Sequence, residues 1–386
     1  MEQTEPPTVG ITKIFPTNVY PVGHILEYPD SYWNDSNRKR ITAEEQRERD
    51  RLAQQEEGAD FNHARRAGEV HRQVRQYARR AIKPGMSMTE IANLIEDTSR
   101  TINEAHGFDS GIGFPTGLSL NEVAAHYTPN AGDKRILQTG DVLKVDIGVH
   151  ASGRIVDSAF TLTFEENSIW QPLVKASQSA TNAGIRAAGV DARLGEIGAI
   201  IQETMESYEV EIKGHLQKIR VVKNLNGHNI ERYRIHGGKS VPCVAMPDYP
   251  QKMDEGEYFA IETFGSTGRG YVEDKGACSH YSRNPGKVPP MRVPSARSLL
   301  KTIDTEFGTL PFCRRYLDRV GEKDYLLGLR YLAQSGIVVE YPPLADSPRD
   351  ANQSIDDVRT SQHEETIRIG ASNVEVLSHG IDYPAF

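Results

Sequence analysis

The segment 140–162 constrains the fold more than any other part of the chain, because it places two aspartates in one hairpin. Apolar and polar residues alternate from 141 to 149, which is the period of a β-strand. Ala151-Ser152-Gly153 has the composition of a turn, and residues 154–162 predict the returning strand.

The two aspartates of this hairpin create an electrostatic problem. A turn centred between Ala151 and Ser152 predicts that Asp146 lies directly opposite Asp157. Opposed residues of antiparallel strands have Cβ atoms roughly 5 Å apart. Two ionised carboxylates at that distance repel each other, so either one stays protonated or a cation lies between them. We favour the cation, which requires further ligands from the rest of the chain.

Composition limits the class of protein. At 386 residues the chain holds two or three average domains, or one large α/β domain with additions. The net charge of −8 argues against nucleic acid, so we expect no DNA partner. Three widely spaced cysteines indicate a reducing compartment, and no apolar run reaches the ~18 residues of a membrane helix. Because the N-terminus also lacks a signal peptide, we expect a cytoplasmic protein with no membrane partner.

The first part of the chain predicts an arm followed by helices. Residues 1–40 predict an extended arm or a partly disordered tail, which ends in the basic triplet 38–40. A long charged helix is expected over 42–82, with apolar spacing at Val70, Val74 and Ala78. Further elements follow along the chain: a capping box at 87–90 that opens a helix, an irregular glycine-rich stretch over 107–133, helices over 171–188 and 194–209, and strands over 219–222 and 257–264.

The character of the sequence changes at about residue 281. Short helices are predicted over 295–307, 313–320 and 323–335, so residues 282–340 are interpreted as a helical insertion. A last strand is expected over 364–369. We therefore divide the chain into an arm with the start of the long helix (1–55) and a catalytic domain (56–386) that contains the insertion. Helices followed by strands occur twice, at 60–165 and 171–265, which indicates a coarse duplication.

Three residues outside the hairpin complete a candidate metal site. His228 follows a strand, Glu262 lies in an apolar strand where it needs a partner, and Glu364 begins the last strand. Together with Asp146 and Asp157 they form a set of four carboxylates and one imidazole, which matches two divalent cations such as manganese, iron, cobalt or zinc. Two such ions can share a water and lower its pKa toward neutrality, which predicts a hydrolase.

At these residues the chain resembles the type 2 methionine aminopeptidases of the pita-bread metallopeptidase family, over about residues 6 to 383. The resemblance implies an α/β fold with a curved antiparallel sheet, flanking helices, a pseudo-two-fold duplication and a helical insertion. It is densest at 114–117, 124–133, 144–148, 153–160, 224–228, 233–236, 260–265, 278–281, 308–318 and 341–344.

The resemblance also implies the roles of the site residues. Asp157 and Glu364 would bridge two metal ions, and a hydroxide held between the ions would attack the carbonyl of an N-terminal methionine. The terminal ligands would be Asp146, His228 and Glu262. Glu262 would also handle the proton of the water.

The remaining implied residues bind the substrate. His126 would lie near the scissile amide nitrogen, and His236 would donate to the carbonyl oxygen; spacing alone would have made His236 a sixth ligand. The methionine pocket would be lined by Phe114, Ile235 and His280, with Tyr341 at its rim.

The implied enzyme is a monomer that acts on nascent polypeptides with a small second residue. The family also suggests the ribosome as a partner, although residues 1–40 lack the lysine-rich and acidic blocks of many eukaryotic members.

Two alternatives remain open. An X-Pro aminopeptidase or dipeptidase of the same fold shares the five ligands but lacks the insertion with 313–318. A catalytically silent relative that acts as a binding module would have lost ligands, whereas all five are present in this chain.

Overall fold

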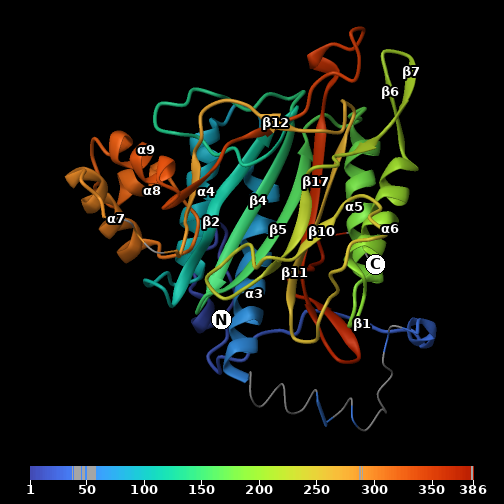
Figure 1. Ribbon diagram of the computed structural model, residues 1–386, viewed down its shortest axis with the longest axis horizontal. Helices are drawn as coiled ribbons and strands as arrows, with labels where there is room; N and C mark the ends of the chain where they lie inside the picture. Colours follow the sequence, from blue (N-terminus) through green and yellow to red (C-terminus); the bar gives the residue numbers. More distant parts are fainter. Residues whose placement is uncertain are drawn as a thin grey trace.

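The computed structural model describes residues 1–36, 38, 45, 48–49, 58–286, 288, 290–383 and 386. Two antiparallel sheets form its centre (Figure 1). The first sheet has the order β2-β4-β5, with β2 at Ser110–Leu120, β4 at Val142–Ala151 and β5 at Arg154–Thr163. The second has the order β1-β18-β17-β11-β9-β10, with β8 also paired to β11. Its strands are β1 (His24–Glu27), β18 (Asn373–Val376), β17 (Thr360–Ile369), β11 (Tyr258–Ser266), β9 (Asn226–Ile230), β10 (Ser240–Pro242) and β8 (Arg220–Val221).

Two pairs of helices cover these sheets. Helices α3 (Gly58–Ala81) and α4 (Met88–Ile102) pack on the first sheet, and α5 (Gln171–Ala187) and α6 (Leu194–Glu206) on the second. Each pair encloses its own apolar core. In α3 the predicted apolar positions Val70, Val74 and Ala78 are fully buried. The repeated arrangement of a helix pair on a sheet agrees with the predicted duplication.

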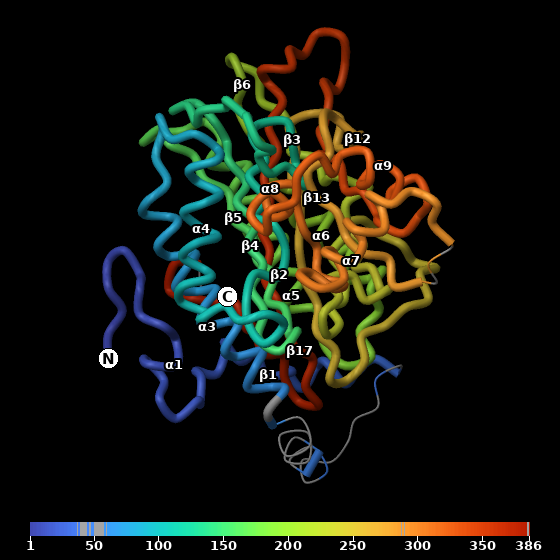
Figure 2. Tube along the Cα trace, turned by 90° about the vertical axis from the view of Figure 1, so that its left-hand side faces the viewer, coloured from blue at the N-terminus to red at the C-terminus, as the bar shows by residue number. Residues whose placement is uncertain are grey.

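Residues 282–340 contain the three predicted helices, α7 (Pro294–Glu306), α8 (Arg314–Arg319) and α9 (Leu326–Gln334). They surround a third apolar cluster and pack against a small sheet of β13 (His280–Arg283), β14 (Phe312–Cys313) and β15 (Val338–Tyr341). In Figure 2, α7 and α9 lie on the right and α3 and α4 on the left, with α8 between them. The remaining elements are α1 (Ile11–Ile14), η1 (Asp30–Asn34), β3 (Val123–Ala125), β6 (Glu209–Ile212), β7 (His215–Lys218), β12 (Glu273–Asp274), β16 (Leu344–Ala345) and η2 (Ile355–Asp357).

The structure corrects the predicted hairpin register. Ala151 pairs with Arg154, so the turn is Ser152-Gly153 and Asp146 lies opposite Ala159 rather than Asp157. Ser152 and Gly153 both have positive φ, as a two-residue hairpin turn requires. Asp146 and Asp157 are therefore diagonal neighbours on one face of the hairpin, a position in which two residues are typically roughly 7 Å apart.

The prediction that residues 107–133 are irregular is also largely wrong, because this stretch contains strands β2 and β3. The register of β2 against β4 shifts on either side of Phe114. Gly117 lies so close to Asp146 that a Cβ atom there would come within 2.9 Å of the Asp146 Cβ. The glycines thus allow strand pairing at close approach, where sequence composition suggested a loop.

The N-terminal arm packs on the body. Strand β1 pairs with β18, and η1 buries Tyr32. Only Arg38 of the predicted basic triplet 38–40 belongs to the described residues, and its guanidinium donates to the Tyr32 carbonyl. Most of the first half of the predicted 42–82 helix lies outside them as well, and the described helix α3 ends at Ala81 as expected. The predicted capping box between Ser87 and Glu90 is present.

Candidate metal centre and active site

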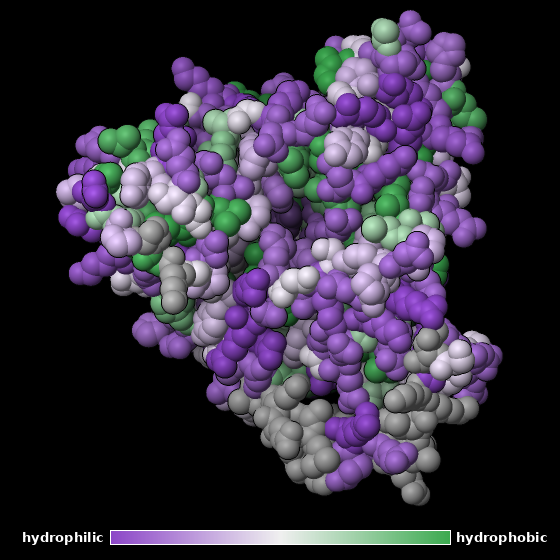
Figure 3. All heavy atoms as spheres, viewed as in Figure 1, coloured by the Kyte–Doolittle hydropathy of each residue, from purple (hydrophilic) through white to green (hydrophobic). Residues whose placement is uncertain are grey.

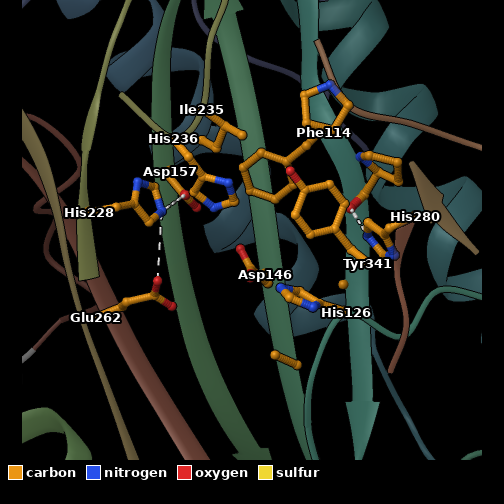
Figure 4. Close-up of a pocket in the computed structure, with 14 residues that line it drawn as sticks. Phe114, His126, Asp146, Asp157, His228, Ile235, His236, Glu262, His280 and Tyr341 are labelled. Atoms are coloured by element: carbon orange, nitrogen blue, oxygen red, sulfur yellow. Dashed lines mark hydrogen bonds and ion pairs between the residues drawn. The ribbon is translucent and has the colours of Figure 1, made fainter. Parts of the chain in front are cut away.

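The five predicted ligands come from both sheets and meet between them. Asp146 and Asp157 lie on β4 and β5, and His228, Glu262 and Glu364 lie on β9, β11 and β17. Glu262 is directly opposite Glu364 in the strand register. The Nε2 atom of His228 is 3.7 Å from both Asp157 Oδ2 and Glu262 Oε1 (Figure 4). One ligand atom from each of Asp157, His228 and Glu364 lies within 4.8 Å of the others.

The electrostatics of this cluster call for a cation. Asp157 and Glu364 are only 4% and 1% exposed. Burial, followed by the neighbouring carboxylates, raises the pKa values of Asp157, Glu262 and Glu364 well above their ordinary range, and burial raises that of Asp146 to about 6. Without a cation the protein therefore retains protons in the cluster, because ionised carboxylates so close together repel each other.

Unpaired atoms support the same conclusion. Asp146 Oδ1, Asp157 Oδ1 and both carboxylate oxygens of Glu364 are buried without a hydrogen-bond partner among the described residues. Unsatisfied buried acceptors are costly, and a metal ion satisfies them. The donors are carboxylate oxygens and one imidazole nitrogen, which fits divalent ions such as manganese, iron, cobalt or zinc.

Gln362 is a site residue that sequence reasoning missed. Its Nε2 donates to Asp146 Oδ2 at 3.3 Å and to Glu262 Oε2 at 3.4 Å, and thereby links carboxylates of the two sheets. It lies two residues before Glu364 on β17. Because side chains of a strand alternate between faces, residue 362 shares the face of residue 364, and this was the signal available in the sequence.

A cavity of about 80 Å³ adjoins the carboxylates. Figure 3 shows this face of the molecule hollowed near its middle, between the insertion and the second sheet. The cavity is lined by ten of the predicted site residues, Phe114, His126, Asp146, Asp157, His228, Ile235, His236, Glu262, His280 and Tyr341, and by Pro115, Gly117, Ala125 and Pro311. Glu364 joins the site through its neighbours Asp157 and His228.

One end of this cavity is apolar and closely fitted. Phe114 and Ile235 are buried, and a Cβ atom on Gly148 would come within 2.3 Å of the Phe114 ring, so only glycine leaves room for that ring. His280 Nε2 lies 3.0 Å from the Pro115 carbonyl, which fixes the ring orientation. This end of the cavity suits an apolar group.

Two more histidines stand between this pocket and the carboxylates. The ring of Tyr341 lies 5.6 Å from that of His126 and 5.8 Å from that of His236, and His236 packs edge-on against His228 at 4.5 Å. Burial lowers the pKa of His126 to about 3 and that of His236 to about 4, so both rings are neutral at pH 7. A neutral imidazole can donate one hydrogen bond and accept another.

His126 also has an unusual backbone. Its φ is +66°, in the left-handed region that non-glycine residues rarely adopt. Its Nδ1 is buried, and no residue in the described part of the chain forms a hydrogen bond with it. Such strain occurs at functional sites, where the surrounding structure holds the residue in place.

Comparison with known proteins identifies the family. The pattern of metallopeptidase family M24 matches residues 62–287. The chain is 61% identical to methionine aminopeptidase 2 of Malassezia globosa over 385 residues, which cover 99% of this chain and 83% of that protein. It is 56% identical to methionine aminopeptidase 2 of Schizophyllum commune, over 99% and 86% of the two chains.

Solved structures show the same fold at low sequence identity. A thermophilic Arx1 superposes with a TM-score of 0.67 at 17% identity, over 84% of this chain and 91% of that one. A methionine aminopeptidase from Thermotoga maritima superposes with a TM-score of 0.53 at 20% identity, over 82% and 95%. The predicted pita-bread α/β fold is thus confirmed.

The chain belongs to metallopeptidase family M24. Within that family, its high-identity relatives are the fungal methionine aminopeptidases 2, as the sequence resemblance predicted. They favour a methionine aminopeptidase over the X-Pro peptidase alternative. None of the helices in the described part of the chain is long and apolar enough to cross a membrane.

Proposed function

We propose that this protein is a methionyl aminopeptidase that binds two divalent metal ions and removes the N-terminal methionine of polypeptides whose second residue is small. The observation that carries the proposal is the meeting of four buried carboxylates and one imidazole beside a narrow apolar pocket. The names of the fungal relatives support the substrate class.

In this proposal Asp146, Asp157, His228, Glu262 and Glu364 would hold the ions, and Asp157 and Glu364 would be the ligands shared between them. When bound, the ions supply an activated water and polarise the scissile carbonyl. Manganese, iron, cobalt and zinc all suit this ligand set.

The substrate is positioned by the pocket and the histidines. Phe114, Ile235 and His280 receive the methionine side chain, with Tyr341 at the rim. An unbranched thioether fits such a pocket because it adapts to irregular apolar space.

Polar groups then act on the scissile amide. A neutral His236 donates its N–H to the carbonyl oxygen as negative charge develops there. His126 lies by the amide nitrogen. Glu262 would accept the proton of the attacking water and pass it on to the leaving amine.

The second residue of the substrate meets the rings of His126, His236 and Tyr341, whose close packing leaves room for small side chains. Because N-terminal methionines arise where proteins are made, the proposal places the enzyme in the cytoplasm, with the ribosome as a partner. It also includes a monomeric enzyme.

The test compares peptides and metals. Protein stripped with a chelator is reloaded with manganese, iron, cobalt or zinc and incubated with Met-Ala-Ser, Met-Leu-Ser and Ala-Pro peptides. The proposal predicts release of methionine from Met-Ala-Ser only, and about two ions per chain by elemental analysis. Cleavage of the Ala-Pro peptides alone would instead indicate an X-Pro peptidase, and no cleavage with any metal would indicate a binding relative.

A further inference from the structure

The two sheets that carry the ligands meet at strands β5 and β17, which belong to different sheets. Their backbones are joined through side-chain hydroxyls. Thr366 Oγ1 on β17 donates to the Asp157 carbonyl at 2.6 Å and accepts from the Asp157 N–H at 2.8 Å. In the reverse direction, Thr161 Oγ1 on β5 donates to the Gln362 carbonyl at 2.8 Å and accepts from its N–H at 2.9 Å. Each threonine therefore satisfies both backbone groups of one residue on the opposite strand.

A third hydroxyl lies between these two bridges. Ser158 Oγ donates to the Glu364 carbonyl at 2.6 Å and lies 2.8 Å from the Tyr383 hydroxyl. Because the single hydroxyl proton of Ser158 is used on Glu364, Tyr383 is the donor, and its one hydroxyl proton is shared between Ser158 Oγ and the Ala159 carbonyl at 3.2 Å. The Tyr383 ring is in turn held under the Arg75 guanidinium at 3.8 Å. Thr161, Ser158 and Thr366 together form a seam of hydroxyls between the two sheets, and the C-terminal segment supports this seam from the face opposite to the carboxylates.

The residues held by this seam belong to the candidate metal centre. Asp157 and Glu364 are candidate ligands, and Gln362 donates to the carboxylates of both sheets. A direct backbone ladder would place neighbouring strands about 4.8 Å apart. A hydroxyl bridge sets the strands further apart, because the Oγ and Cβ atoms of the bridging residue lie between the two backbones. The seam therefore determines how far the Asp146–Asp157 half of the centre lies from the half on β9, β11 and β17.

We propose that Thr161, Ser158 and Thr366, named the hydroxyl seam, are positioning residues that set the spacing of the two halves of the metal centre. The proposal rests on the proposed function only in that the carboxylates bind metal; it does not depend on which peptide is cleaved. Groups that hydrogen-bond the ligating side chains of a metal site commonly change metal affinity 10- to 100-fold when they are removed, and the hydroxyl seam acts on the same ligands through their backbone.

The experiment replaces Thr366 with valine, which has the size of threonine but no hydroxyl, and with serine, which keeps it. Thr267→Val is the matched control, because the hydroxyl of buried Thr267 also joins backbone groups: it donates to the Asp357 carbonyl at 2.7 Å, lies 3.4 Å from the Arg359 carbonyl, and accepts from the Arg359 N–H at 2.8 Å. Calorimetric titration of the chelator-stripped proteins with cobalt or manganese gives the affinities, and the absorption spectrum of the cobalt form reports ligand geometry.

We expect T366V to bind metal about 10- to 100-fold more weakly than wild type and to change the cobalt spectrum, and T366S and T267V to resemble wild type. Should T366V not fold, S158A and T161V test the same seam, with the same direction of change. An unchanged affinity and cobalt spectrum in the folded seam variants, with thermal stability lowered as in T267V, would overturn the proposal, since the seam would then be only structural.

The outcomes also separate this proposal from the proposed function. Weaker metal binding by T366V in a protein that cleaves no methionine peptide would support the seam and reject the aminopeptidase. Wild-type protein that binds no divalent ion at all would overturn both.

Discussion

Replacing Asp146 with asparagine should make the metal-free protein more stable, although the residue is a proposed ligand. Burial raises the pKa of Asp146 from 3.8 to about 6. An acid whose pKa is higher in the folded state destabilises that state at pH values above both pKa values. At about 1.4 kcal/mol per pH unit, the difference corresponds to a cost of about 3 kcal/mol at pH 7.5. Asparagine has no such cost, and its amide oxygen can still accept from Gln362.

The sign of the effect reverses when metal is present. Wild-type protein gains about 4.1 kcal/mol when free metal is at about 1,000 times its dissociation constant, which exceeds the advantage of the variant in chelator. Asp146→Asn removes a charged ligand and should lose most of this gain. The variant is therefore expected to be more stable than wild type in chelator and less stable than wild type in metal. Its advantage in chelator should shrink as the pH falls from 6 towards 3.8 and vanish below, where the aspartate is protonated in both states.

Urea denaturation with chelator and with added cobalt or manganese measures both quantities. Asp346→Asn is the control, because Asp346 is buried outside the centre and accepts from Ser266 Oγ at 2.6 Å and the Gly270 N–H at 2.8 Å. It should lower the free energy of unfolding in both conditions and keep the gain from metal. The reasoning is refuted if Asp146→Asn is less stable than wild type in chelator and gains as much as wild type from metal.

Four further substitutions test the site and the insertion. Glu364→Ala should abolish turnover and lower the metal content, and near-normal turnover would contradict its assignment as a ligand. His126→Ala should lower kcat by about 10²- to 10⁴-fold with metal content unchanged by elemental analysis, whereas loss of metal would make it a ligand. His236→Ala should lower kcat about 10²- to 10³-fold with little change in KM, and a change confined to KM would exclude a role in the transition state. Glu96→Ala should cost about 3–5 kcal/mol in urea denaturation, because it leaves Arg315, paired with it at 2.7 Å, without its buried partner; a loss below about 1 kcal/mol would show that the pair does not hold the insertion to α4.

Local sequence patterns predicted many of the elements correctly. The alternation around Asp146 predicted a strand, Ser87 and Glu90 predicted a helix start, and the apolar spacing of α3 predicted its buried face. These signals are short-range, since strand period, helix period and capping each depend on residues a few positions apart. The predicted hairpin register was wrong because the turn lies one residue further along the chain than composition suggested. A shift of one residue in the turn changes the partner of Asp146 by two positions, from Asp157 to Ala159.

The sequence by itself determined which side chains are available, namely five candidate metal ligands, the two further histidines and the apolar residues of a pocket. Only the tertiary structure decided how these groups meet. The ligands come from segments more than 200 residues apart, and their spacing depends on how two separate sheets are joined by Thr161, Ser158 and Thr366. The physical reason is that a hydroxyl bridge between strands leaves no periodic pattern in the chain, because it depends on contacts between residues distant in sequence.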